Sequence, residues 1–248
     1  MNRHPPTMQE SALGSWEVLK DRSTSTELGV LWRWNQYRVL FGNQNLTEQV
    51  LLEHFPQVEL LKVKQIHSSK VVLASHEPVE ADAHFSASSN VALQIKTADC
   101  MPVFALDSKT NIIMAIHSGW RGVVGRIVEL AIDEIMKRGS KPRDVHVVIG
   151  PHIRKQSFEV DQPVWVELMD AIPVEFHHEA SRYYEKIHGE KYKVDLEGII
   201  KTQLKNKGVL EQHVESLSAD TLTELSWHSY RRDKENSGRN ISFILRDS

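Results

Sequence analysis

The chain has 248 residues, of which 40% are hydrophobic and 25% charged, and its formal net charge is -3. This composition is typical of a globular protein with one domain or two small ones, and it excludes the strongly basic field of a general nucleic-acid or anionic-lipid binder. The single cysteine, Cys100, excludes an internal disulfide framework. No apolar run approaches the roughly 20 residues of a membrane span, and no secretory apolar core is visible at the N-terminus. We therefore expect a soluble cytoplasmic protein, a monomer or homodimer, that binds neither nucleic acid nor membrane.

The first part of the chain is predicted to be a polar arm followed by strands and one helix. Residues 1–26, with Pro5 and Pro6, indicate a loose arm that has one docked turn near Trp16–Leu19, whereas 27–248 should form a single catalytic domain. Propensity and apolar spacing then predict strands over 29–41, a helix over 46–55 capped by Thr47, strands over 58–66 and 70–74, a loop over 75–90 that contains Asp82, and a strand over 91–95.

Two strands joined by a short turn are predicted next, with a helix after them. The apolar runs MPVFAL and NIIMAI flank the turn-like residues 107–110, so Cys100 should begin one strand and His117 should end its antiparallel neighbour. Apolar residues at helical spacing predict a helix over 123–138 that ends at Gly139. Further elements are predicted as strands over 144–149, 214–217 and 240–245, a helix over 195–207 and polar sequence over 175–192. Because strands and helices do not alternate strictly, we expect a layered, mixed-sheet α/β (α+β) sandwich rather than a Rossmann fold.

Three side chains at predicted strand ends are candidate metal ligands: His67, Cys100 and His117. Their spacing matches no compact zinc signature, but strand ends hold functional side chains rigidly. One thiolate and two imidazoles would form a zinc site with an open fourth position, where a bound water can reach a pKa of about 7. Asp99, beside the thiol, can orient an imidazole or move a proton, or merely cap a turn. The alternative for Cys100 is inert packing.

The Gly119–Gly122 turn, Gly-Trp-Arg-Gly, is a candidate anion site. It lies between the strand that ends at His117 and a predicted helix, so backbone N–H groups should converge there. Arg121 would add a forked cation suited to phosphate or carboxylate. The alternative is that the glycines permit tight packing and Arg121 is a surface charge.

Several motifs together resemble the YfiH family, also called the laccase-domain, multicopper polyphenol oxidase or peptidoglycan editing factor family. The matching motifs run in order over roughly 60–245: Gln65-Ile66-His67, Thr97-Ala98-Asp99-Cys100-Met101-Pro102-Val103, Ala115-Ile116-His117-Ser118-Gly119-Trp120-Arg121-Gly122, Ile149-Gly150-Pro151, Phe158-Glu159-Val160, Asp195-Leu196, Gln203-Leu204, Ser229-Tyr230-Arg231-Arg232 and Gly238-Arg239. The resemblance implies a βαββα-type sandwich related to the cytotoxic necrotizing factor deamidases. It also implies that His67, Cys100 and His117 bind zinc, with copper less favoured, and that Gln65, Arg121 and Arg231 contact substrate.

The activity implied by the resemblance is phosphorolysis of purine nucleosides, including methylthioadenosine, and deamination of adenosine, with nucleoside and phosphate as small-molecule partners. Departures from the family pattern at His152, Arg154, Lys155 and Ile200 leave substrate preference open, and His152 could add a polar group to the pocket. Other hypotheses are a cysteine hydrolase or amidase that uses Cys100 and His117, editing of peptidoglycan precursors, copper-dependent phenol oxidation and a non-enzymatic binding module.

Overall fold

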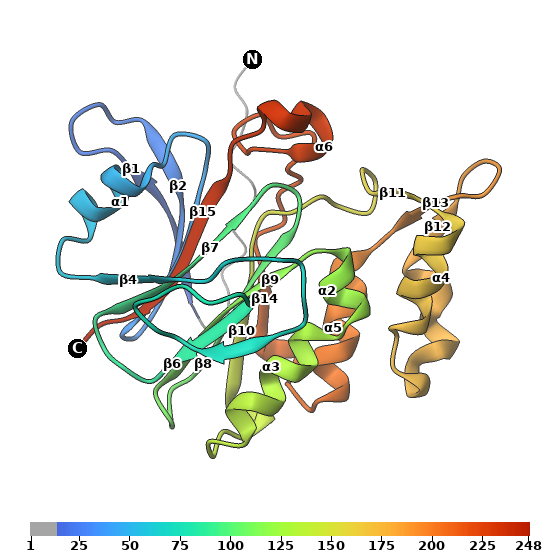
Figure 1. The fold of residues 1–248 in the computed structure, drawn as a ribbon, viewed down its shortest axis with the longest axis horizontal. Coiled ribbons are helices and arrows are strands. Elements are labelled where there is room, and N and C mark those ends of the chain that lie inside the picture. Colours follow the sequence, from blue (N-terminus) through green and yellow to red (C-terminus); the bar gives the residue numbers. More distant parts are fainter. Residues whose placement is uncertain (1–13) are drawn as a thin grey trace.

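The protein is described by a computed structural model in which residues 14–248 are placed (Figure 1). It has a mixed α/β fold in which two six-stranded sheets pack face to face, accompanied by a three-stranded sheet. The first sheet has the strand order β1 (Ser15–Lys20), β2 (Glu27–Trp34), β3 (Tyr37–Gly42), β15 (Asn240–Arg246), β7 (Val91–Thr97) and β4 (Glu59–Lys62). The second has the order β14 (Val214–Ser216), β10 (Val145–Ile149), β8 (Met101–Asp107), β9 (Ile112–Ser118), β6 (Ala83–Ser86) and β5 (Val71–Leu73).

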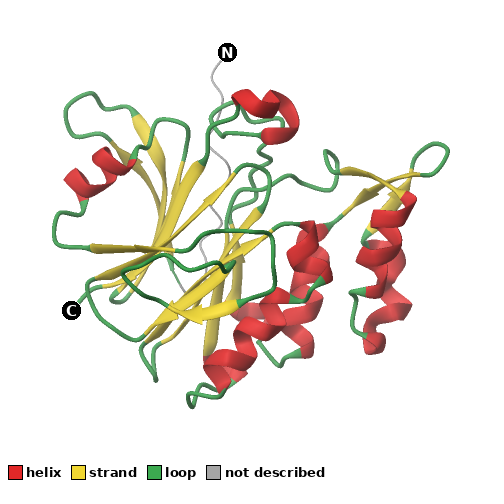
Figure 2. Cartoon of the chain, viewed as in Figure 1, coloured by secondary structure: helices red, strands yellow, loops and turns green. Residues whose placement is uncertain are grey.

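Helices cover the outer faces of both sheets, as the red ribbons of Figure 2 show. The helix α1 (Glu48–His54) covers the first sheet, and α2 (Trp120–Val124), α3 (Ile127–Met136) and α5 (Leu196–Asn206) cover the second. The remaining helices are α4 (Gln162–Asp170), which packs on the small sheet β11 (Glu159–Asp161), β13 (Lys191–Val194) and β12 (Tyr184–Lys186), and α6 (Tyr230–Asp233) near the C-terminus. The 3-10 helices span Pro142–Asp144, Val174–Arg182, Glu211–His213 and Lys234–Asn236.

The central strand β8 is buried on both faces, which explains its uninterrupted apolar sequence. Met101, Val103 and Ala105 point toward the helices, whereas Phe104 and Leu106 enter the core between the two sheets. This alternation follows from the two-residue period of a strand. A rigid strand that is buried on both sides therefore follows directly after Cys100.

The predicted pairing of the two central strands is confirmed. In the antiparallel register of β8 and β9, Met101 lies opposite Ser118 and Pro102 opposite His117. Thr47 also caps α1, as predicted, because its side chain accepts a hydrogen bond from the Val50 N–H. No helix within the described residues 14–248 has the length and apolar character needed to cross a bilayer.

The N-terminal turn expected near Trp16–Leu19 is wrong, because Ser15–Lys20 forms a strand that pairs antiparallel with β2. Trp16 stacks on Phe41 with ring centroids 6.2 Å apart, and its indole N–H donates to Glu215. These long-range contacts outweigh the polar character of the local sequence. The part of the arm before residue 14 lies outside the described residues.

The helix predicted over 123–138 is confirmed for Ile127–Met136 (α3), but its start is wrong, because a break after Val124 separates α3 from α2. Gly125 ends α2, and Arg126 follows in the left-handed region with φ 54°. A Cβ at Gly125 would overlap the Ser69 hydroxyl, so the turn that contains His67 packs directly against this break. The apolar spacing on both sides gives no sign of the interruption.

Two polar stretches contain more regular structure than their sequences indicate. The segment expected as a loop over 75–90 includes β6, and the polar region over 175–192 includes β12 and part of β13. The strand β6 pairs with β5 in parallel and with β9 in antiparallel orientation. Both pairings depend on partners distant in sequence, which local propensity does not report.

Candidate metal centre

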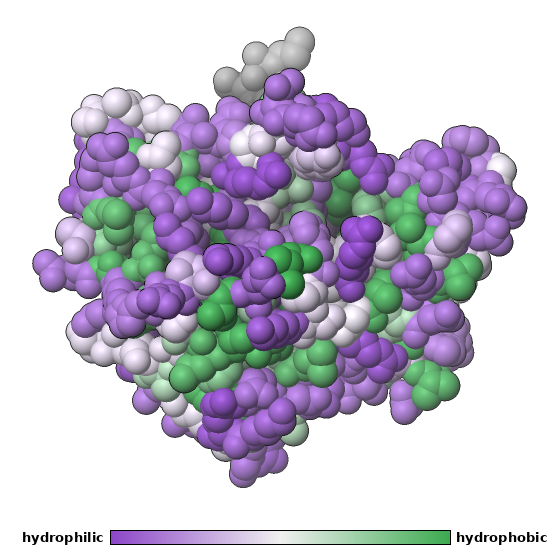
Figure 3. Space-filling view, in the orientation of Figure 1, coloured by the Kyte–Doolittle hydropathy of each residue, from purple (hydrophilic) through white to green (hydrophobic). Residues whose placement is uncertain are grey.

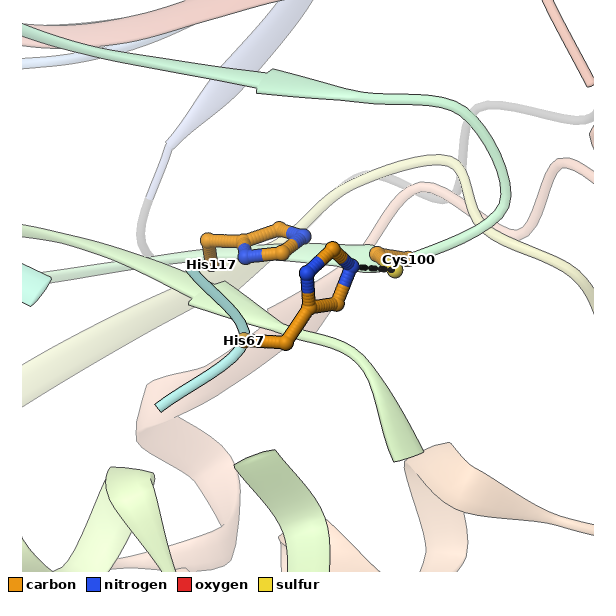
Figure 4. Close-up of side chains that lie close together, drawn as sticks. All are labelled: His67, Cys100 and His117. Carbon is orange, nitrogen blue, oxygen red and sulfur yellow. Dashed lines mark hydrogen bonds between the residues drawn. The ribbon is translucent and has the colours of Figure 1, made fainter. Parts of the chain in front are cut away.

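The fold brings His67, Cys100 and His117 together from three separate segments (Figure 4). His67 lies in the turn between β4 and β5, Cys100 immediately precedes β8, and His117 is on β9. One potential ligand atom from each side chain lies within 4.8 Å of the other two. Among the residues that the structure describes, no other group of three histidine, cysteine or acidic side chains meets this criterion.

The arrangement of these side chains fits a metal ion with one open side. The Cys100 Sγ is 3.9 Å from the His67 Nε2, and the two imidazole rings meet edge to face with centroids 4.9 Å apart. His117 is 3% exposed, whereas His67 is exposed to solvent. A thiolate and two imidazoles are the donor set that zinc prefers, and three protein ligands leave a position for a substrate or water.

Because Gly119 has no side chain, it leaves the space that the Cys100 sulfur occupies. A Cβ at this position would lie 2.8 Å from the Cys100 Sγ and 3.4 Å from the His67 Cδ2. Any side chain here would therefore push the thiol or the imidazole out of place. The Gly-Trp-Arg-Gly segment expected as a turn is the start of α2, with Gly119 directly before the helix, and this glycine has a steric function at the cluster itself.

A buried carboxylate, that of Asp82, contacts the cluster. Its Oδ1 accepts a hydrogen bond from the His117 Nδ1 at 2.8 Å, so the Nε2 of that ring is the nitrogen available to a metal. The turn residues from Ile66 to Ser68 also donate to it. The sequence places Asp82 in a loop and does not mark it as a site residue, because the signal that identifies it is a contact with residues far away in the chain.

The electrostatics of the cluster favour a charged thiolate and a charged imidazole. Burial alone would raise the pKa of Cys100, but hydrogen bonds and positive charge from His117 and His67 outweigh it and lower that pKa to about 6. Burial would likewise lower the pKa of His117, yet its bonds to Asp82 and Cys100 raise it to about 9. Burial opposes the ionised form of Asp82 as well, but hydrogen bonds from His117 and Ser68 lower its pKa to about 2. Each charge is thus stabilised by an opposite one.

A pH profile of thiol alkylation tests this arrangement. In the metal-free protein, the rate of iodoacetamide labelling of Cys100 should rise with pH through a midpoint near 6, because the thiolate is the nucleophile and its pKa is lowered to about 6 from the ordinary 9.0. The measurement is mass spectrometry of the alkylated peptide after timed quenching. Free glutathione, measured in parallel, should titrate near the ordinary value for a thiol. A midpoint above pH 8 for Cys100 would contradict the ion pair.

The carboxylate of Asp99 holds two loops together. It accepts hydrogen bonds from the Thr221 hydroxyl at 2.7 Å and from the Arg231 backbone N–H at 2.6 Å, and its own φ is 81°. The Asp99 carbonyl also accepts from the Ile153 N–H. These contacts fix the backbone directly before Cys100. They support a positioning role, and a proton-transfer role for Asp99 stays a prediction.

The three residues predicted to bind substrate lie in different surroundings. Arg121 is exposed, and its guanidinium stacks over the Trp120 ring 4.5 Å from the centroid. The Gln65 amide exchanges two hydrogen bonds with the Lys96 backbone, so its side chain extends the edge of the first sheet. The Arg231 guanidinium donates to the Glu159 carbonyl. Arg121 is thus the cation among them whose side chain is exposed to solvent.

The residues that depart from the family pattern make contacts within the protein. His152 is buried, and its Nδ1 bonds to the Gly150 carbonyl while its Nε2 lies 3.6 Å from Glu197. Arg154 pairs with the same glutamate, and the Lys155 ammonium donates to a backbone carbonyl. Ile200 is a core residue on α5. His152 is therefore committed to internal contacts.

Comparison with known proteins identifies the family to which this fold belongs. The family model described as multi-copper polyphenol oxidoreductase laccase matches residues 24–247. The chain belongs to this laccase-domain (YfiH) family.

Relatives in the laccase-domain family include curated bacterial proteins. The purine nucleoside phosphorylase of Deinococcus radiodurans is 32% identical over 186 residues, which cover 75% of this chain and 69% of the relative. The purine nucleoside phosphorylase YfiH of Shigella flexneri is 31% identical, with 73% and 72% covered. The crystal structure of YlmD from Geobacillus stearothermophilus superposes with a TM-score of 0.82 at 20% identity, with 93% of this chain and 99% of that chain covered. At 20% identity, the similarity to YlmD shows the fold alone.

Proposed function

We propose that this chain is a purine nucleoside phosphorylase with a metal centre formed by His67, Cys100 and His117. The observation that carries the proposal is the convergence of these three donor side chains in a chain whose curated relatives are named purine nucleoside phosphorylases. The substrates would be a purine nucleoside and inorganic phosphate. We further propose that residues 27–248, together with the strand β1 that pairs with β2, act as one catalytic domain.

Zinc is the metal that this donor set favours. The ligand atoms of one thiolate and two imidazoles lie close together, and Gly119 leaves space around the sulfur. When bound, zinc would act as a Lewis acid and activate a water near neutral pH. Oxidation of phenols by a multicopper centre needs many imidazoles around several copper ions. Residues 14–248 supply one cluster of three candidate ligands, two imidazoles and one thiol, which is too few for such a centre.

The residues around the cluster can support phosphorolysis. In that reaction a phosphate oxygen bonds to the ribose C1′ while the bond from C1′ to the purine nitrogen breaks, and the released purine takes up a proton. Arg121 offers a solvent-facing guanidinium suited to the phosphate. Asp82 keeps the His117 ring fixed, so that the open face of the cluster is presented in one geometry.

Methylthioadenosine phosphorolysis and adenosine deamination are finer parts of the same proposal. Deamination adds water at C6 of adenine and releases ammonia, and a metal with an open coordination position can activate that water.

A cytoplasmic location is part of the same proposal. Nucleosides and phosphate are available in the cytoplasm, and a single cysteine without a disulfide partner suits that reducing compartment.

The test combines metal analysis with a substrate panel. The purified protein should contain close to one zinc per chain, and it should release free purine from inosine, guanosine, adenosine or methylthioadenosine only when phosphate is present. Chromatography separates phosphorolysis from deamination, because deamination of adenosine gives inosine without phosphate. A zinc-loaded protein that leaves the whole panel unchanged would refute the proposal.

A second candidate function is that of a cysteine hydrolase or amidase, including one that edits peptidoglycan precursors. It is favoured by the lowered pKa of Cys100 next to a basic imidazole, the pairing that activates a nucleophilic cysteine. Iodoacetamide distinguishes the two functions: a catalytic thiol reacts in the protein as purified, whereas a zinc-bound thiol reacts only after chelation. The muropeptide composition of a deletion strain tests the editing role.

A further inference from the structure

The carboxylate of Asp82 accepts several hydrogen bonds beside the cluster. It lies directly before β6 and is 0% exposed. Its side chain accepts five hydrogen bonds, from the backbone N–H groups of Ile66 (3.2 Å), His67 (3.0 Å) and Ser68 (2.6 Å), from the Ser68 hydroxyl (2.7 Å) and from the His117 Nδ1 (2.8 Å). Its backbone takes part as well, since the Asp82 carbonyl accepts from the His117 N–H at 2.7 Å.

One oxygen of this carboxylate serves both histidines. The Asp82 Oδ1 accepts from the His67 backbone N–H and from the His117 ring, while Oδ2 accepts from Ile66 and Ser68. An ionised carboxylate has no proton to donate, so the His117 Nδ1 must carry the hydrogen. This leaves the Nε2 of His117 as the ligand atom, and the choice of tautomer follows from a single contact.

The backbone at His67 also depends on Asp82. His67 has φ 58°, a left-handed conformation that is unfavourable for a residue with a Cβ. Three successive N–H groups, from Ile66 to Ser68, point at the Asp82 carboxylate and hold the chain in this conformation. The direction in which the His67 side chain leaves the turn is therefore set by the same group that orients His117.

We propose that Asp82 is a positioning residue that places both histidine ligands through one carboxylate, so that the two imidazoles form the metal site as a unit. This inference rests on the proposed metal centre, but it concerns metal binding and needs no particular substrate. Asp82 itself would not touch the metal. Its role is to pre-organise the ligands that do.

The decisive variant is Asp82→Asn, which preserves shape but replaces one acceptor oxygen by an NH₂ donor. In either amide orientation the NH₂ group would face N–H donors: those of His67 and His117, or those of Ile66 and Ser68. Zinc affinity, measured by competition with a chromophoric chelator, should fall by about 10- to 100-fold, the usual effect of losing such a partner. The exposed Glu80→Gln, on the same loop, removes an equal charge and should leave the affinity unchanged.

A second readout separates positioning from general destabilisation. Long-range ¹H–¹⁵N correlation of the imidazoles should show protonated Nδ1 at His117 in the wild-type zinc form, and a changed Nδ1 signal in Asp82→Asn. Unchanged zinc affinity together with an unchanged His117 signal would overturn the proposal. If Asp82→Asn does not fold, the variant Ser68→Ala is used instead, because it removes one hydrogen-bond donor from the Asp82 Oδ2 and spares the bond to His117. The zinc affinity of Ser68→Ala should fall while the His117 Nδ1 signal stays unchanged. A wild-type zinc affinity in this variant would overturn the proposal. A wild-type protein that binds zinc but lacks phosphorolysis would refute the proposed function and leave this inference standing.

Discussion

Replacing Cys100 by alanine is expected to abolish stoichiometric zinc binding and to reduce phosphorolysis by at least about 100-fold, because loss of even an outer partner of a metal ligand costs 10- to 100-fold. Cys100 contributes the anionic member of the cluster, and its pKa, lowered to about 6, keeps it ionised at neutral pH. Without the thiolate, two imidazoles remain, which is fewer than the three protein ligands of a catalytic zinc site. Metal content by mass spectrometry and phosphate-dependent purine release are the two measurements.

The matched variants for this prediction are Cys100→Ser and His76→Ala. A serine hydroxyl retains the size and hydrogen-bonding capacity of the thiol but does not ionise near neutrality, so Cys100→Ser should fail in the same way. His76 has an exposed imidazole that pairs with Glu59, and its removal should leave both measurements unchanged. Full turnover by a metal-free Cys100→Ala protein would show that the cluster does not carry the activity.

Replacing Phe104 by alanine is expected to lower the free energy of unfolding by about 3–5 kcal/mol, the usual cost of emptying a large core site. Phe104 is on β8, is 0% exposed, and packs at a centroid distance of 5.6 Å against Phe41 of the opposing sheet. The cavity would lie between the two sheets, where both are rigid and neither can easily collapse. Urea denaturation of the metal-free protein measures the loss.

The control for the Phe104 prediction is Leu73→Ala on the edge strand β5. The Leu73 residue is 63% exposed, so its truncation should change the free energy of unfolding by no more than about 0.5 kcal/mol. A loss below 1 kcal/mol for Phe104→Ala would mean that the core between the sheets tolerates a large cavity. That result would contradict close packing of this core.

Local sequence patterns predict the strands and helices in which apolar residues recur at a regular spacing. Residue types alone predict the β8–β9 hairpin, the Thr47 cap of α1 and the α5 helix with Asp195 at its start. Elements that depend on distant partners were missed. The strand β1 forms because it pairs with β2, and β6 forms because it lies between β5 and β9.

The amino-acid sequence by itself determines the donor chemistry of the candidate site: one thiol, two imidazoles and a glycine-bordered turn, each beside an apolar segment that must form rigid structure. Which groups meet is decided by folding, since strand register and turn conformation are long-range properties. Folding places the carboxylate of Asp82, rather than that of Asp99, against the His117 ring, and ties Asp99 to Thr221 and Arg231 instead. A hydrogen bond needs a donor–acceptor distance near 3 Å. Asp82 and His117 meet at such a distance although they are 35 positions apart in the sequence, and no local pattern encodes a contact over that separation.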